Sequence, residues 1–468
     1  MKKIIFFLII LSACNPSVET NQKIDFNESG MDWINQATIY EVNLRQYTSD
    51  GTINSFKKKL PKLKELGVDI LWFMPLQPIG IKNRKAVGDS FVEDFPNPDY
   101  DKYWGSPYSI SDYKQVNPRY GTLSEFKELI KLCHELDMKV VLDWVANHTA
   151  WDNSWIIDHP EWYTHDSTGK ITDPIGEDGK SWGWTDVADL NYENDKMRKA
   201  MIDAMSFWIK ECDIDGFRCD VAMEVPVDFW NEASKQLNQI KPIFMLAESE
   251  AHKPRMFDSA FDAYYGWEMH HVFNKIYAGE LSSSEIIRVM NEKDSICGDH
   301  VFPMNFITNH DENSWNGTID ERLGESWGAM AVLSYSLRGM PLIYSGQEVG
   351  LDHRLSFFEK DSIDWNKPNG EEYFNFYKGL NKLKQEKAFS INSSISCDII
   401  GENLFRIVRG DSSEYQIILN LNSGEAITQK VSIPENYEIV LQKGINDNNA
   451  MDKWGYLILK NKRFIKVL

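Results

Sequence analysis

The chain has 468 residues, a hydrophobic content of 42% and a formal net charge of −20. Because this length exceeds one ordinary domain and the apolar content can build a large core, we expect one large domain with a smaller one attached. The negative charge excludes a nucleic acid as the expected partner, since a polyanion would be repelled, and leaves neutral or cationic ligands open.

The first residues have the pattern of an export signal. Lys2-Lys3 precede an apolar run from Ile4 to Leu11, which is too short to span a bilayer as a helix. The run ends in Leu11-Ser12-Ala13-Cys14, which resembles the lipobox of bacterial lipoproteins. The resemblance implies a protein anchored through lipid on Cys14 to the periplasmic or cell-surface face of a bacterial membrane. An ordinary secretory signal is the alternative, and both interpretations predict export.

Short apolar runs with the character of β-strands alternate with helical patterns between residues 38 and 345. The predicted strands are 38–44, 70–75, 140–145, 216–221, 243–247, 260–265, 304–308 and 341–345. A helix is expected at 122–136, where Thr122 and Glu125 form a capping box. Eight strands separated by helices predict an α/β fold, the closed (β/α)₈ TIM barrel. An open doubly wound sheet competes with it, but no phosphate-binding glycine fingerprint follows the first strand.

Two segments depart from this alternation. After the third strand, 45 polar, tryptophan-rich residues (149–193) precede a helical pattern at 194–210, and loops of this length form a subdomain or carry function. After Ser390 the pattern changes to short alternating strands, which predict an antiparallel β-sandwich domain. The predicted division of the chain is a signal peptide at 1–13, a linker at 14–30, a barrel domain at 31–390 that includes the inserted subdomain, and a C-terminal β domain at 391–468.

Three acidic residues stand where predicted strands end. Asp220 closes the run Gly216-Phe217-Arg218-Cys219-Asp220, Glu248 follows 243–247, and Asp311 follows 305–310. Because C-terminal strand ends converge on one mouth of a barrel, we expect these side chains to share a site. The alternative is three unrelated surface acids among the 70 acidic residues of the chain.

The neighbours of these acids suggest different roles for them. Arg218 precedes Asp220 by two residues, so both side chains point the same way along a strand. A guanidinium favours the ionised form of a carboxyl group, which suits Asp220 as a nucleophile. Glu248 follows apolar residues, so burial would raise its pKa and suit it as a proton donor. Two carboxyl groups on adjacent strands can approach the ~5–5.5 Å separation of retaining glycosidases.

Six motifs follow one another in the chain at or after the predicted strands. They are Gly105-Ser106-Pro107-Tyr108 with Asp112-Tyr113, Asp143-Trp144-Val145-Ala146-Asn147-His148, Ala188-Asp189-Leu190-Asn191, Gly216-Phe217-Arg218-Cys219-Asp220, Leu246-Ala247-Glu248-Ser249, and Phe306-Ile307-Thr308-Asn309-His310-Asp311. Together they resemble the α-amylase family of glycoside hydrolases (glycoside hydrolase family thirteen). The resemblance extends from about Thr38 to the end of the chain.

This resemblance implies a retaining hydrolase that cleaves α-1,4 bonds of starch, glycogen or maltooligosaccharides. Asp220 would form a covalent glycosyl-enzyme, Glu248 would be the acid and base, and Asp311 would hold sugar hydroxyls. The substrate site would include Tyr108, which stacks on the sugar, His148 and His310, which donate hydrogen bonds to it, and Arg218, which Asp143 orients.

The family resemblance also implies a structural calcium ion, with no catalytic cofactor. Asn147 and Asp189 match two ligand positions, and the main-chain carbonyl of Glu224 would be a third. Oxygen ligands suit calcium; the alternative is that these residues only tie the long loop to the barrel.

One departure leaves the bond preference open: Met223-Glu224 stands where the family's amylases often have Lys-His. A transglycosylase, or an α-1,6 or exo-acting α-glucosidase of the same family, is therefore the first alternative. A non-catalytic glycan-binding barrel and an unrelated metal-dependent barrel hydrolase are the others.

Overall fold

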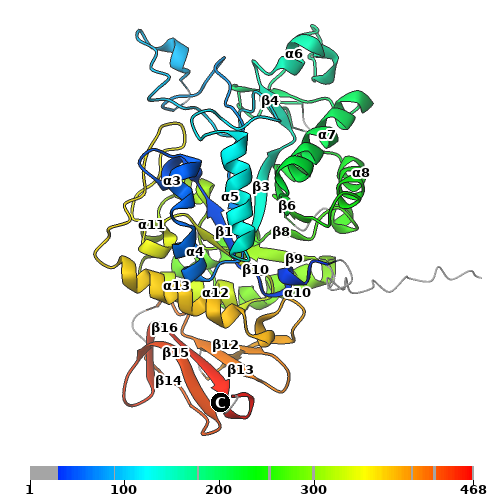
Figure 1. The fold of residues 1–468 in the computed structure, drawn as a ribbon. Helices are drawn as coiled ribbons and strands as arrows, with labels where there is room; N and C mark the ends of the chain where they lie inside the picture. Colours follow the sequence, from blue (N-terminus) through cyan, green and yellow to red (C-terminus); the bar gives the residue numbers. More distant parts are fainter. Residues whose placement is uncertain are drawn as a thin grey trace, which may run out of the picture.

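Eight parallel strands form a closed barrel in the computed structural model of the protein (Figure 1). Each strand pairs with its neighbours in chain order, and β10 pairs back with β1. The barrel strands are β1 (Ile39–Val42), β2 (Ile70–Phe73), β3 (Lys139–Val145), β6 (Gly216–Asp220), β7 (Phe244–Ala247), β8 (Ala263–Tyr265), β9 (Phe302–Asn305) and β10 (Met340–Tyr344). The prediction of a TIM barrel is confirmed.

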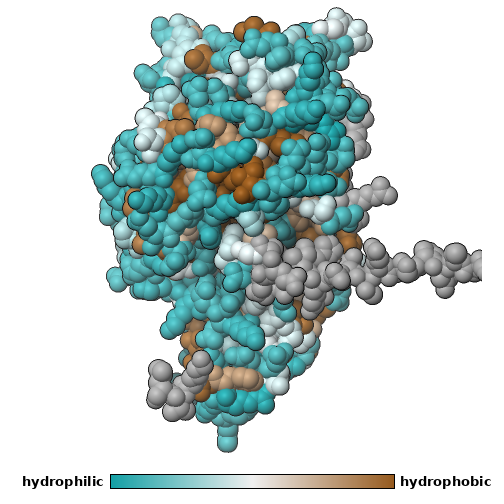
Figure 2. All heavy atoms as spheres, turned by 45° about the vertical axis from the view of Figure 1, so that its right-hand side comes forward, coloured by the Kyte–Doolittle hydropathy of each residue, from teal (hydrophilic) through white to brown (hydrophobic). Residues whose placement is uncertain are grey.

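The structure describes residues 30–88, 90–176, 179–250, 254–297, 301–401, 404–424 and 428–465. The predicted signal peptide, Cys14 and the predicted linker up to residue 29 lie outside these ranges. Within them, no helix combines the length and the apolar character needed to cross a membrane. The face of the molecule drawn in Figure 2 is mostly hydrophilic, with smaller apolar areas between polar side chains.

Side chains that alternate along the strands fill both surfaces of the barrel wall. Trp72 and Leu342 belong to a buried cluster within the barrel, whereas their neighbours Phe73 and Ile343 belong to the larger cluster packed under the helices. The main helices of the barrel domain are α4 (Leu60–Leu66), α5 (Leu123–Glu135), α7 (Asp195–Cys212), α8 (Val227–Asn238), α9 (Trp267–Tyr277), α10 (Ser284–Cys297), α12 (Trp327–Ser336) and α13 (Gly370–Lys384).

Helix α5 shows how local sequence sets an element boundary. Thr122 Oγ1 accepts a hydrogen bond from the Glu125 backbone N–H at 3.2 Å, and Glu125 Oε2 accepts one from the Thr122 N–H at 2.7 Å. This reciprocal capping box satisfies two otherwise unpaired amides. The buried face of the helix carries Phe126, Leu129 and Ile130, which form an apolar stripe at helical spacing.

Between β3 and α7 the chain leaves the barrel and builds a small subdomain, which lies at the opposite end of the molecule from the C-terminal domain (Figure 1). Here β4 (His148–Ala150) pairs antiparallel with β5 (Val187–Asp189), and α6 (Ser154–Asp158) lies between them in sequence. The rings of Trp155 and Trp162 pack edge to face at 5.1 Å. These tryptophans therefore build the subdomain.

The C-terminal strands form one antiparallel sheet in the order β11-β12-β13-β16-β14, with β15 also paired to β16. They are β11 (Ile395–Ile400), β12 (Leu404–Arg409), β13 (Tyr415–Leu419), β14 (Gln429–Lys430), β15 (Tyr437–Ile445) and β16 (Ala450–Asn461). The predicted antiparallel domain is confirmed, but these strands are joined in a single sheet rather than in the two sheets of a sandwich. The reason is that β16, 12 residues long, pairs with β13, β14 and β15 along its length.

Candidate active site

The C-terminal ends of the barrel strands surround a cleft of about 430 Å³, a size typical of ligand sites. Its lining includes six side chains that the sequence predicted as catalytic or substrate-binding: Tyr108, His148, Asp220, Glu248, His310 and Asp311. The seventh, Arg218, is fully buried and holds two of these acids. The structure thus brings together all the predicted catalytic and substrate-binding residues.

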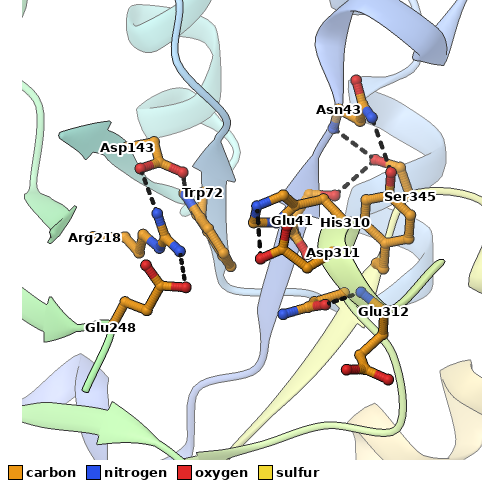
Figure 3. Close-up of polar contacts among 12 residues, drawn as sticks. Glu41, Asn43, Trp72, Asp143, Arg218, Glu248, His310, Asp311, Glu312 and Ser345 are labelled. Atoms are coloured by element: carbon orange, nitrogen blue, oxygen red, sulfur yellow. Dashed lines mark hydrogen bonds and ion pairs between the residues drawn. The ribbon is translucent and has the colours of Figure 1, made fainter. Parts of the chain in front are cut away.

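Arg218 is the centre of one buried charge cluster (Figure 3). Its Nη1 atom lies 2.8 Å from Asp220 Oδ1 and 2.9 Å from Asp143 Oδ1, and its Nη2 atom lies 3.0 Å from Glu248 Oε1. Its Nε donates to the Tyr265 hydroxyl at 2.9 Å. The strand register explains the set, because Arg218 pairs with Asp143 on β3 and with the residue two before Glu248 on β7.

The two carboxyl groups at the base of the cleft differ in their pKa. Burial raises the pKa of Asp220 to about 6, although Arg218 opposes this shift. Burial raises the pKa of Glu248 to about 7, with Arg218 opposing and the charges of Asp220 and Asp311 adding to the effect. Arg218 favours the ionised form of Asp220, as we expected, but burial outweighs it and the net shift of the Asp220 pKa is upward. Glu248 still holds its proton to higher pH, which is the order that a nucleophile and an acid require.

A strained backbone turn holds Glu248 in place. Val221 follows the end of β6 with φ of 44° and ψ of 40°, a left-handed conformation that a β-branched residue rarely adopts. In this conformation its N–H donates to Glu248 Oε2 at 2.8 Å. The sequence did not predict this conformation of Val221, because valine rarely adopts a positive φ.

Asp311 lies beyond its strand rather than at the strand end. We expected a strand at 304–308, but β9 ends at Asn305, and Asp311 directly precedes a π-helical turn, Glu312–Asn316. Glu312 is buried and fixes this turn, with Oε2 3.1 Å from His270 Nε2 and 3.4 Å from Arg322 Nη1. The Asp311 side chain is 34% exposed and faces the cleft.

The two predicted histidines lie in different environments. His310 Nδ1 lies 2.5 Å from Glu41 Oε1, and its Nε2 lies 2.7 Å from the Tyr108 hydroxyl and 3.4 Å from Asp311 Oδ2. His148 begins β4, and burial lowers its pKa to about 3, so it is neutral. The structure therefore offers one histidine beside two carboxylates and one uncharged histidine in the same cleft.

Aromatic side chains form much of the cleft wall. Phe357 stacks parallel to Tyr108, with ring centroids 6.2 Å apart, and contacts Trp315 at 5.0 Å. Trp315 and Trp184 also line the cleft and are 51% and 37% exposed. Flat, partly exposed rings suit stacking on a ligand. Only Trp184 belongs to the tryptophan-rich segment that the sequence singled out.

The predicted calcium ligands are partly brought together. Asp189 pairs with His148 across the β4–β5 ladder, and the Asn147 carbonyl accepts from the Leu190 N–H, so Asn147 and Asp189 lie close in the fold. Burial raises the pKa of Asp189 to about 6, although Thr164 opposes the shift, and a cation would relieve that cost. No group of three His, Cys, Asp or Glu side chains in the described ranges is placed to hold a metal. Any ion here would need the Asn147 amide and main-chain carbonyls such as that of Glu224.

A closed β/α barrel with carboxylates at its C-terminal strand ends defines a barrel enzyme site. Comparison with known proteins gives the family: the family model described as alpha amylase, catalytic domain, matches residues 24–390. The chain belongs to the α-amylase family of glycoside hydrolases.

The curated relatives of the chain are named for different enzymatic activities. Alpha-amylase 3 of Dictyoglomus thermophilum is 25% identical over 68% of this chain and 65% of its own length. Probable oligo-1,6-glucosidase 3 of Bacillus subtilis is 26% identical over 68% of this chain and 66% of its own. The chain thus spans slightly less than two thirds of each. The crystal structure of an α-amylase from Lactobacillus plantarum is similar with a TM-score of 0.74 and 28% identity, covering 91% of this chain and 98% of that one.

Proposed function

We propose that the protein is a retaining α-glucan hydrolase that cleaves α-1,4-glucosidic bonds of starch, glycogen or maltooligosaccharides. The observation that carries the proposal is the double contact of Arg218, whose two terminal nitrogens bind Asp220 and Glu248 at 2.8 and 3.0 Å. This contact holds two carboxyl groups side by side at the base of the cleft, as retaining glycosidases require. The charges of Asp220 and Asp311 add to the upward shift of the Glu248 pKa, which supports Glu248 as the acid and Asp220 as the nucleophile.

In the first step, Asp220 attacks the anomeric carbon while Glu248 gives its proton to the departing glycosidic oxygen. The bond from the anomeric carbon to that oxygen breaks and a bond to Asp220 forms. In the second step, Glu248 takes a proton from water, and the resulting nucleophile releases the sugar from Asp220. Asp311 faces the same space and would hold hydroxyls of the distorted sugar.

The aromatic cleft walls support a neutral sugar polymer as substrate, since Trp184 and Trp315 expose flat apolar faces without adding charge. The relatives include proteins named α-amylase and oligo-1,6-glucosidase, so the preferred bond is the part of the proposal that substrate digestion decides. Met223, at the position that departs from the family pattern, is 36% exposed.

Digestion of amylose and pullulan, with sizing of the products over time, tests the proposal. We expect amylose to give a mixture of short maltooligosaccharides from early times. Release of one glucose at a time would instead support the exo-acting alternative. Cleavage of only the α-1,6 bonds of pullulan would support an α-1,6 preference. Products longer than the substrate would support a transglycosylase. Absence of any glucan cleavage would overturn the function.

We also propose a structural calcium ion held by Asn147, Asp189 and the Glu224 carbonyl. Their oxygen donors suit calcium, whose role would be to stabilise the junction of the inserted subdomain and the barrel. Calcium should raise the thermal midpoint of the wild type, and Asp189→Asn should remove that increment. An equal increment in both proteins would contradict the site.

We propose further that the chain is exported and anchored to a bacterial membrane through lipid on Cys14. Cys14→Ala should move the protein from the membrane fraction to the soluble exported fraction. Retention of the variant in the membrane fraction would contradict the anchor.

A further inference from the structure

Glu41 is a buried carboxylate in the middle of an apolar strand. It is 0% exposed, its neighbours Tyr40 and Val42 are equally buried, and it is not part of the cleft lining. Its Oε1 atom lies 2.5 Å from His310 Nδ1. Figure 3 draws the two residues next to each other. A carboxyl group in this place costs free energy unless a partner compensates it, so its contact with His310 needs an explanation.

The hydrogen bonds around His310 define where its protons are. The Tyr108 hydroxyl donates its hydrogen to Asp143 Oδ2 at 3.1 Å, and Asp143 also accepts from Arg218, which can only donate. Because a hydroxyl has one hydrogen, the Tyr108 oxygen must accept from His310 Nε2, which lies 2.7 Å away. Nε2 therefore carries a proton. Burial raises the pKa of Glu41, and the charges of His310 and Arg218 oppose that shift. With Glu41 ionised, its Oε1 accepts a hydrogen bond from a second proton-bearing nitrogen, Nδ1, at 2.5 Å.

We propose that Glu41 is a positioning residue that holds His310 as an imidazolium ion, with one N–H fixed on Glu41 and the other directed to Tyr108 and the mouth of the cleft. This places a positive charge next to Asp311, beside the space where the proposed function puts the sugar. The kinetic consequence rests on that proposed function, whereas the protonation state of His310 does not.

The charges around His310 agree with this assignment. Burial lowers the pKa of His310, but Asp311 and Glu41 outweigh it and raise the value to about 9, against a smaller opposing effect of Arg218. The rings of Trp72 and Phe357 pack at 6.0 and 6.5 Å and add no charge. The titratable or charged groups that face His310 are Glu41 on β1, Tyr108 after β2, Asp143 on β3, Arg218 on β6 and the adjacent Asp311.

The wild-type protein allows a direct test that needs no activity. With ¹⁵N-labelled histidine, and the His310 signals assigned by their loss in His310→Asn, both ring nitrogens should show imidazolium shifts at pH 7. The ring should begin to titrate only above pH ~8, because two adjacent carboxylates stabilise the cation. A neutral ring at pH 7 would overturn the proposal.

The variant Glu41→Gln keeps the size of the side chain and removes its charge. We expect the His310 titration to move down by about 1 to 3 pH units. The alkaline limb of kcat/KM should then become steeper, because His310 and Glu248 lose protons over the same range. At one pH unit above the new His310 pKa, kcat/KM of the variant should be about tenfold lower than that of the wild type at the same pH. An unchanged titration would refute the role of Glu41.

Glu348→Gln is the matched control. Glu348 is also a buried acid, but it accepts from the Tyr40 hydroxyl at 2.5 Å and the Gly346 N–H at 3.0 Å and has no contact with His310. Its variant should leave the His310 titration unchanged, and an equal shift in both variants would mean a general structural effect and refute the proposal. If Glu41→Gln does not fold, the wild-type spectrum decides. If the wild type cleaves no α-glucan, the proposed function fails while both titrations still decide the state of His310.

Discussion

Two buried cations organise the two sides of the cleft, and they differ in whether they can lose their charge. Arg218 binds Asp143, Asp220 and Glu248 within 3.0 Å, and a guanidinium stays protonated at any working pH. His310 binds Glu41 and lies beside Asp311, and an imidazole holds its proton only as long as its neighbours favour the charge.

The two clusters are built from acids with different tasks. The acids around Arg218 include those that must change protonation state during the reaction, so a permanent charge is the suitable centre for them. The His310 cluster supplies a positive charge beside Asp311, and its carboxylate Glu41 is buried in β1 and does not line the cleft. Changes on the Arg218 side should therefore abolish the chemistry, and changes on the His310 side should alter its pH range.

The largest expected effect is that of Asp220→Asn. The amide cannot form the glycosyl-enzyme, so hydrolysis should fall by at least about 10³-fold while starch binding persists. Initial rates on amylose and a starch-binding assay measure the two properties. Turnover close to that of the wild type would show that another group is the nucleophile.

Arg218→Lys should have the next largest effect. An ammonium is a point charge and cannot bridge Asp220 and Glu248 as the planar guanidinium does, so kcat/KM should fall by about 10²-fold. Arg406→Lys is a suitable control, since Arg406 binds Asp398 through Nε and Nη2 in the C-terminal sheet. Equal losses in both variants would indicate a general effect of arginine replacement.

The Arg218 side of the site was largely predictable from the sequence. The alternation of strands and helices predicted the barrel, and the i, i+2 spacing predicted that Arg218 lies beside Asp220. Both features depend on local geometry. The opposing strength of burial was not predictable. Desolvation of Asp220 depends on how the whole barrel closes over it, and no short segment contains that information.

The His310 side was less predictable for the same reason. Glu41 and His310 are 269 residues apart, and they meet only because the barrel closes through β10 back to β1. A carboxylate inside the apolar run Ile39–Val42 was a signal that could have been noticed. The π-helical turn after Asp311 had no such signal, since it depends on the contacts of Glu312 with α9 and Arg322.

The pH profile of the wild type tests whether the Arg218 cluster alone sets the limits of activity. Asp220 must be ionised, so kcat/KM should fall as the pH drops through about 6. Glu248 must be protonated, so kcat/KM should fall as the pH rises through about 7. His310 remains charged across this window. A two-proton alkaline limb in the wild type would show that His310 already titrates there.

The smallest effect on activity is expected for Glu312→Gln, which disturbs the support of the His310 side without touching the cleft acids. Burial alone would raise the pKa of Glu312, but its contacts with His270 and Arg322 lower it to about 2. Because burial also lowers the pKa of His270, Arg322 is the charged partner of Glu312 at neutral pH. Removing this buried charge should lower the free energy of unfolding by about 3 kcal/mol at neutral pH. Activity should fall less than about tenfold, because the Asp311 side chain is retained and only the turn that carries it becomes less rigid.

The acid dependence of this loss identifies its cause. Since the pKa of Glu312 is lower in the folded state than in the unfolded state, its contribution is complete above pH ~4.5 and disappears as the pH falls from there toward 2. The unfolding free energies of the wild type and Glu312→Gln, measured by denaturant titration, should therefore converge in acid. A difference that is independent of pH would mean that packing of the side chain, rather than its charge, holds the turn that carries Asp311.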